Sequence, residues 1–243
     1  MTNKLIVALD VETAAQAREL HASLRDYAGM FKVGSQLFTA AGPEIVREIV
    51  SAGGRVFLDL KFHDIPNTVA AAAREAVRLG VSIFNVHAFG GREMMRRAAE
   101  AAAETAEREG LTKPSVIAVT VLTSLDAAML TEIGITFTPE AQATLLARLA
   151  CSCGLDGVVA SAHEIKQVRA VATREGFLVV VPGVRQRAVA GDDQKRVMSP
   201  GEAVRAGADY IVMGRAIISA PDPAVAAREV YEEMSRVEGA ATA

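Results

Sequence analysis

Short apolar runs recur along the 243-residue chain, and stretches with helical periodicity follow them. The predicted strands, with the helices after them, are 4–9 with 13–24, 30–34 with 36–52, 55–60 with 69–77, 82–86 with 92–109, 115–122 with 139–153, 157–160 with 164–175, 177–181, and 209–213 with a helix from residue 223. Gly42-Pro43 marks a break inside the second helix, and Ser124 is expected to cap a short extra helix before residue 139.

Strands that are apolar throughout belong to a parallel sheet covered on both faces. Eight such units without a domain boundary between them favour a closed barrel over an open doubly wound sheet. No Gly-x-Gly-x-x-Gly follows the first run, which weakens the dinucleotide-binding alternative. We therefore expect one α/β domain over residues 1–243, a (β/α)8 TIM barrel with a frayed tail at about 236–243.

Composition excludes several classes of function. The net charge is -3, without a basic stripe or an acidic tail, so we expect neither nucleic acid nor a membrane surface as a partner. No apolar run approaches the roughly 18 residues that span a bilayer, and residues 1–4 lead straight into the first strand, which indicates a cytoplasmic protein. The only cysteines, Cys151 and Cys153, are too few for a structural zinc site, and the four histidines are scattered, so no metal site is expected.

The segment from Asp59 to Thr68 lies where the third apolar run turns into a helix. Because side chains alternate along a strand, Asp59 and Lys61 share one face and lie about 6 to 7 Å apart along it. Asp64 comes from the following loop, and Pro66 suits the first turn of a helix. Two carboxylates therefore bracket one lysine. A surface ion pair with a helix cap is the alternative, but charges seldom occupy the interior face of a strand unless they are paired and used.

Polar side chains also follow the other strands, at the end of a barrel where active sites lie. These candidates, at or just beyond strand ends, are Asp10, Lys32, Asp59, Lys61, Thr123, Arg185 and Arg215. Gly214-Arg215 after the last strand predicts an anion site, because a glycine admits the ligand to backbone N–H groups and the guanidinium supplies charge; an ordinary turn is the alternative. The long polar loop 183–199, with Arg185 and Gln194, predicts a lid over the same anion, or else a disordered insertion.

These residues resemble the orotidine 5′-phosphate decarboxylase family over essentially the whole chain. The motifs that carry the resemblance are Ala8-Leu9-Asp10, Phe31-Lys32-Val33-Gly34, Asp59-Leu60-Lys61-Phe62-His63-Asp64-Ile65-Pro66-Asn67-Thr68, Val119-Thr120-Val121-Leu122-Thr123-Ser124, Pro182-Gly183-Val184-Arg185, Gly191-Asp192-Asp193-Gln194 and Gly214-Arg215. The third of these is the most specific.

The resemblance implies conversion of orotidine 5′-phosphate to uridine 5′-phosphate and carbon dioxide, in pyrimidine biosynthesis and without a cofactor. Lys61 would protonate C6 of the pyrimidine as carbon dioxide leaves. Asp59 would crowd the departing carboxylate and hold Lys61, while Lys32 would order the charges and the ribose. Asp64 completes the catalytic set that the resemblance implies.

The resemblance also implies how substrate binds. The implied substrate-binding residues are Asp10, Lys32, Asp59, Thr68, Thr123, Pro182, Arg185, Gln194, Gly214 and Arg215. Asp10 would bind ribose hydroxyls, Thr123 would contact the pyrimidine edge, and the last four would bind the phosphate. Asp64 and Thr68 would reach into the site of the neighbouring subunit, so a homodimer with shared sites is expected.

Two alternatives differ in reaction or in class. A related group of barrels, which includes 3-keto-L-gulonate 6-phosphate decarboxylase, shares Asp-x-Lys-x-x-Asp but acts on sugar phosphates through magnesium. Those proteins carry a glutamate where this chain has Lys32, and a cation there would repel Mg²⁺. A non-catalytic phosphate-binding barrel is the second alternative, and the intact set of Asp59, Lys61 and Asp64 argues against it.

Overall fold

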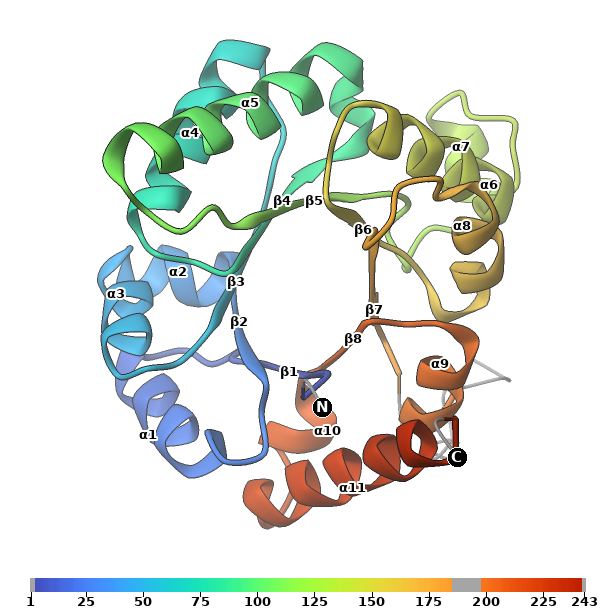
Figure 1. Ribbon diagram of the computed structural model, residues 1–243. Helices are drawn as coiled ribbons and strands as arrows, with labels where there is room; N and C mark the ends of the chain where they lie inside the picture. Colours follow the sequence, from blue (N-terminus) through green and yellow to red (C-terminus); the bar gives the residue numbers. More distant parts are fainter. Residues whose placement is uncertain (1–2, 185–197, 242–243) are drawn as a thin grey trace.

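The chain forms a closed barrel of eight parallel strands in the order β1 to β8, with helices around the outside (Figure 1). This computed structural model describes residues 3–184 and 198–241. The strands are β1 (Leu5–Ala8), β2 (Met30–Gly34), β3 (Val56–Phe62), β4 (Ile83–His87), β5 (Ser115–Val119), β6 (Gly157–Val159), β7 (Leu178–Pro182) and β8 (Tyr210–Met213). The predicted (β/α)8 barrel is confirmed.

The covering layer contains α1 (Ala14–Leu24), α2 (Ser35–Ala41), α3 (Glu44–Ser51), α4 (Pro66–Arg78), α5 (Gly91–Glu109), α6 (Ala127–Glu132), α7 (Pro139–Ser152), α8 (Ile165–Val171), α9 (Pro200–Ala206), α10 (Arg215–Ile218) and α11 (Pro223–Ala241), with short 3-10 turns η1 (Ala88–Gly90) and η2 (Ala162–Glu164). The predicted break after α2 and the proline at the start of α4 are both present. Within the described ranges, no helix combines the length and the apolar character needed to cross a bilayer.

The core has two layers, because successive side chains of each strand point to opposite faces of the sheet. Residues that fill the barrel interior are Ile6, Ala8, Met30, Phe57, Ile83, Ile117, Val180, Tyr210 and Val212. The larger layer lies between sheet and helices. Along β2, Met30 belongs to the interior layer and Phe31 to the outer one, so Lys32 points inward again. Its ammonium therefore reaches the barrel mouth above an apolar floor.

Two predicted helix boundaries are wrong. The short helix α6 begins after Asp126, whose carboxylate accepts the N–H of Met129, rather than at Ser124. The helix α8 ends at Val171 instead of extending to residue 175. The helix α9 was not predicted, although Ser199 and Glu202, which cap it through a reciprocal pair of hydrogen bonds, have the spacing of a capping box.

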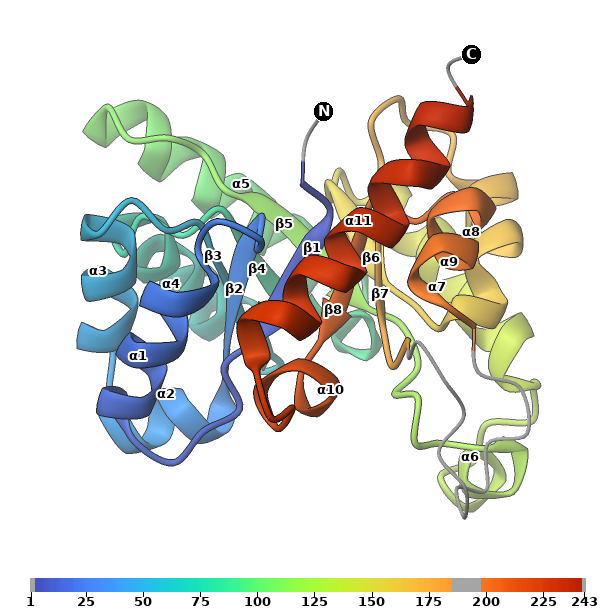
Figure 2. The same ribbon diagram turned by 90° about the horizontal axis from the view of Figure 1, so that it is seen from below.

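The side view shows which end of the barrel is the mouth (Figure 2). Strand β1 begins at the upper end, near the N-terminus, whereas α10 and α6 lie at the opposite end, after the carboxyl ends of β8 and β5. At the C-terminus, α11 runs to Ala241, so helical backbone continues through most of the 236–243 segment expected to fray.

Candidate active site

Four charged side chains alternate in sign across the mouth of the barrel. Lys32 Nζ lies 2.9 Å from Asp10 Oδ1 and 3.4 Å from Asp59 Oδ2. Lys61 Nζ lies 2.6 Å from Asp59 Oδ1, the other oxygen of the same carboxylate. The structure thus brings together Asp10, Lys32, Asp59 and Lys61, and each carboxylate has a lysine beside it.

The inner part of this array is well shielded from solvent. The side chains of Lys32 and Asp59 are 10% and 14% exposed, whereas Lys61 is 36% exposed. A charge pair in such surroundings interacts more strongly than one in water, and it is stable only while both members are present. The buried Lys32–Asp59 pair can therefore fix the geometry, and the more accessible Lys61 is free to meet a ligand.

The backbone at Lys61 departs from a regular strand. Lys61 has φ of 53°, and it is the one non-glycine residue with positive φ in the described part of the chain. The pairing of β3 with β4 also shifts register between Leu58 and Phe62. The predicted alternation is confirmed, since Leu58 and Leu60 pack in the outer apolar layer and the Asp59 and Lys61 side chains lie together on the inner face. The irregular backbone at Lys61 was not predicted. A left-handed non-glycine residue costs about 1–3 kcal/mol and is typical of functional sites.

Asn85, in β4, is a member of the array that sequence reasoning missed. Its Nδ2 donates to Asp59 Oδ1 at 2.7 Å, and its Oδ1 accepts the backbone N–H of Lys61 at 2.8 Å. The residue is fully buried, at 0% exposure. The available signal was an amide in the middle of an apolar strand, since a buried polar side chain requires partners.

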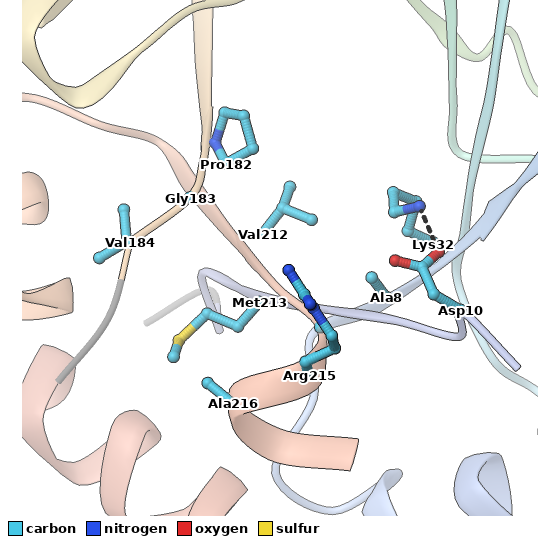
Figure 3. A pocket seen from close by; sticks show the side chains of 11 residues that line it. Ala8, Asp10, Lys32, Pro182, Gly183, Val184, Val212, Met213, Arg215 and Ala216 are labelled. Carbon is cyan, nitrogen blue, oxygen red and sulfur yellow. Dashed lines mark hydrogen bonds and ion pairs between the residues drawn. The ribbon is translucent and has the colours of Figure 1, made fainter. Parts of the chain in front are cut away.

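Two cavities open from the array. The larger, about 610 Å³, is lined by Ala8, Asp10, Lys32, Pro182, Gly183, Val184, Val212, Met213, Gly214, Arg215 and Ala216 (Figure 3). The smaller, about 210 Å³, is lined by Lys32, Phe57, Asp59, Lys61, Val119, Val121, Leu122, Thr123, Val159, Ala160, Pro182 and Val212. Because Lys32, Pro182 and Val212 line both, the two cavities are neighbours and can hold two parts of one ligand.

The larger cavity is suited to an anion. Arg215 extends into it from the start of α10, facing Asp10 and Lys32 (Figure 3), and it has no carboxylate partner among residues 3–184 and 198–241. A Cβ at Gly214 would lie 3.4 Å from both the Ala8 side chain and an Asp10 oxygen, so this turn lies against the end of β1. An unpaired guanidinium beside a glycine turn is an arrangement that binds phosphate.

The smaller cavity is lined mostly by apolar side chains, and its polar members are Lys32, Asp59, Lys61 and Thr123. Apolar walls with a few polar groups are typical of sites that bind an organic ring. The array can therefore act on a group attached to a ring whose phosphate end lies in the larger cavity.

Two predicted site residues lie apart from this arrangement, and two others fall outside the described part of the chain. Asp64 and Thr68 are exposed, and neither lines the two cavities; the Asp64 carboxylate accepts the N–H of Ile65. Arg185 and Gln194 lie outside the described residues.

A histidine stack adjoins Lys61. The rings of His63 and His87 are stacked with centroids 5.4 Å apart, and His87 Nδ1 accepts the N–H of Phe89. Burial, together with the neighbouring His63 and Lys61, lowers the pKa of His87 to about 4. His87 is therefore neutral at pH 7 and adds no positive charge beside the lysine.

Fold and cavities together define a (β/α)8 barrel with a cationic cavity after strands seven and eight, the place where such barrels often bind phosphate. The family model described as orotidine 5′-phosphate decarboxylase / HUMPS matches residues 3–230. The chain is 53% identical over 236 residues to orotidine 5′-phosphate decarboxylase of Moorella thermoacetica, covering 97% of this chain and 93% of that one.

A second relative of the same name, from Geobacter sulfurreducens, is 53% identical and covers 95% of each chain. The crystal structure of orotidine 5′-phosphate decarboxylase from Lactobacillus acidophilus superposes with a TM-score of 0.83 at 33% identity, covering 96% of this chain and 99% of that one. The chain belongs to the orotidine 5′-phosphate decarboxylase / HUMPS family, which confirms the resemblance seen in its motifs.

Proposed function

We propose that this protein decarboxylates orotidine 5′-phosphate to uridine 5′-phosphate and carbon dioxide in pyrimidine biosynthesis. The observation that carries the proposal is the Lys61–Asp59 pair in the apolar cavity, directly beside a second cavity that holds Arg215. That arrangement fits a substrate with a ring at one end and a phosphate at the other. Membership of the family supports the same substrate.

Substrate would lie across both cavities. The phosphate binds at Gly214-Arg215, and the ribose lies between Asp10 and Lys32 near Pro182. The pyrimidine occupies the smaller cavity with Thr123 at its edge. Arg185 and Gln194 are proposed as further phosphate ligands on the family resemblance alone.

The reaction breaks the bond between C6 and the carboxylate, and its electron pair stays on C6. Lys61 then transfers a proton from its ammonium to C6, and carbon dioxide leaves. The carbanion lies in the plane of the ring, where no carbonyl can delocalise it, so fixed charges must stabilise it. Asp59 is positioned to repel the substrate carboxylate while it holds Lys61 through a contact of 2.6 Å.

One lysine is not sufficient for this task. A charge pair at 4 Å contributes about 4 kcal/mol at an effective dielectric near 20, whereas slow reactions require up to about 23 kcal/mol of barrier lowering. The remainder must come from the whole preorganised array and from phosphate binding that seats the reacting carbon. The buried Lys32–Asp59 pair suits the first role and Arg215 the second.

The proposed enzyme is a homodimer in which Asp64 and Thr68 complete the neighbouring subunit's site. Support comes from their exposure within one chain and from Ile65, which is 67% exposed next to Asp64. An apolar side chain so exposed, beside a carboxylate with no lysine partner among the described residues, is suited to burial against another subunit.

No metal or other cofactor takes part in the proposed reaction. The ammonium of Lys32 lies between Asp10 and Asp59, at 2.9 Å and 3.4 Å, and its charge would repel a divalent cation from these carboxylates. This separates the proposal from magnesium-dependent reactions of sugar phosphates. The cytoplasmic location remains a prediction.

The ultraviolet absorbance of orotidine 5′-phosphate tests the proposal. Protein dialysed against EDTA should remove the orotate absorbance rapidly, and the Lys61→Ala variant should not. Binding of the nucleotide without turnover would instead indicate a non-catalytic barrel. A result with no binding and no turnover would contradict the proposal, and sugar phosphates with Mg²⁺ would then be the next substrates to assay.

A further inference from the structure

Asn85 lies opposite the irregular part of β3. The ladder pairs residue 58 with 84 and then 62 with 86, so on the β4 side residues 59–61 of β3 face Asn85 alone. Those three residues include both members of the proposed catalytic pair. On the β4 side, the side chain of Asn85 is therefore the group placed to hold this segment, while β2 pairs with Asp59 from the other side.

The Asn85 side chain takes over the bonding that the ladder lacks there. Its carbonyl oxygen accepts the Lys61 backbone N–H at 2.8 Å, and its amide nitrogen donates to Asp59 Oδ1 at 2.7 Å. Asp59 Oδ1 also receives the Lys61 ammonium at 2.6 Å. These contacts form a closed ring that runs from the Lys61 backbone through Asn85 and Asp59 to the Lys61 side chain.

Both ends of the lysine are thus tied to one buried amide. The left-handed backbone of Lys61, at φ of 53°, leaves its N–H outside the regular ladder, and Asn85 supplies its acceptor. Asp59 Oδ2 faces Lys32 at 3.4 Å, so the bond from Asn85 to Oδ1 fixes the rotation of a carboxylate shared by two lysines. An apolar residue of the same size could fill the space but could do neither.

We propose that Asn85 is a positioning residue that holds the Asp59–Lys61 pair in the orientation needed for proton transfer. The inference rests on the proposed decarboxylation. Asn85 acts through the pair, because it does not line either cavity. Since a misplacement of about 1 Å can cost 10²-fold in rate, losing this amide should be expressed in kcat.

Two substitutions separate the bonds of Asn85. Asn85→Leu has a similar volume and makes neither bond. Asn85→Asp keeps an acceptor for the Lys61 N–H but replaces the donor to Asp59 with a second carboxyl. Val86→Ala is the matched control, since Val86 is the next residue of β4, equally buried, and packs in the outer apolar layer.

Each variant should be measured for kcat, for the Kd of uridine 5′-phosphate and for thermal stability. Asn85→Leu should lower kcat about 100-fold and change the Kd of the product by no more than about threefold, because the phosphate cavity is untouched. Val86→Ala should keep kcat within about threefold of wild type even where its Tm falls. Asn85→Asp should recover activity as the pH is lowered, because a proton on the new carboxyl restores a donor to Asp59.

Several outcomes would overturn the inference alone. One is an Asn85→Leu variant as active as an active wild type, and another is a loss of kcat in Asn85→Leu that is matched by an equal loss of product affinity. The third is a pH profile of Asn85→Asp that runs parallel to that of the wild type. Wild-type protein without turnover would overturn the proposed function itself, and the inference with it.

Discussion

Replacing Glu164 with glutamine should stabilise the fold at alkaline pH. Glu164 ends η2, beyond the carboxyl end of β6, and is only 4% exposed. Its carboxylate accepts the N–H of Ser161 at 2.8 Å. Burial, together with the charge of Glu140, raises its pKa to about 7 against the opposing effect of that hydrogen bond.

The size and sign of the effect follow from this pKa. A free glutamate has a pKa of 4.5 against about 7 here, and each tenfold change in proton affinity is about 1.4 kcal/mol, so the ionised form costs ~3 kcal/mol. Between these two values the folded protein keeps a proton that the unfolded chain releases. Wild-type stability therefore falls as pH rises from 4.5 to about 7 and is level above that range.

Glutamine removes the charge and keeps an oxygen to accept the Ser161 N–H. A neutral acceptor makes a weaker bond than a carboxylate, so the expected net gain at pH 8 is about 2 kcal/mol. For a chain of this length that corresponds to a rise in Tm of roughly 4–8 °C. Most of the difference should disappear by pH 5, where the wild-type carboxyl is already protonated.

The difference in Tm between Glu164→Gln and wild type can be measured by thermal unfolding, followed by circular dichroism from pH 5 to 8 at fixed protein concentration. Glu202→Gln is the matched control: Glu202 accepts the N–H of Ser199 at 2.8 Å in the same kind of capping pair, but its side chain is exposed. It should gain no stability at any pH. An equal Tm difference for Glu164→Gln at pH 5 and pH 8, or a lower Tm than wild type at pH 8, would refute the reasoning.

Two further predictions concern the proposed reaction. Arg215→Ala should lower kcat/KM for orotidine 5′-phosphate about 100-fold or more, because charged hydrogen bonds to the phosphate contribute about 1.5–3 kcal/mol each. The loss is expected although Arg215 lies in the larger cavity, away from Lys61. Steady-state kinetics would measure it, with Arg215→Lys expected to keep part of the activity, and an unchanged kcat/KM would contradict the role given to phosphate binding. Dimers of Lys61→Ala and of Asp64→Ala should each be inactive, but mixing them with subunit exchange should rebuild one intact site per mixed dimer; an absence of recovered activity in the mixture would show that the two residues do not share sites across subunits.

The barrel was predictable because its signal is local and repeated. The strands are apolar runs, several of which carry a polar residue in or just after their carboxyl-terminal half, and closing eight such runs brings those residues together without any knowledge of long-range contacts. Asp10, Lys32, Asp59 and Lys61 were found in this way, and the structure places them within contact distance in sequence order.

The rest depended on pairing between strands, which a single sequence does not reveal. Asn85 matters because of what lies opposite it in β3, and the left-handed Lys61 exists because that pairing slips. Ser124 and Asp126 are both acceptable caps two residues apart, and residue type alone does not choose between them.

The larger cavity lies on the seam where the barrel closes. Strand β1 pairs with β8, and the turn at Gly214 packs against Ala8 and Asp10 from the opposite end of the chain. These are contacts between residues far apart in sequence, which cost the most loop entropy to form. The anion site exists only in a chain whose first and last strands have paired, so nucleotide binding should favour the closed barrel by mass action. The ligand would then stabilise the pairing of β1 with β8 that closes the barrel.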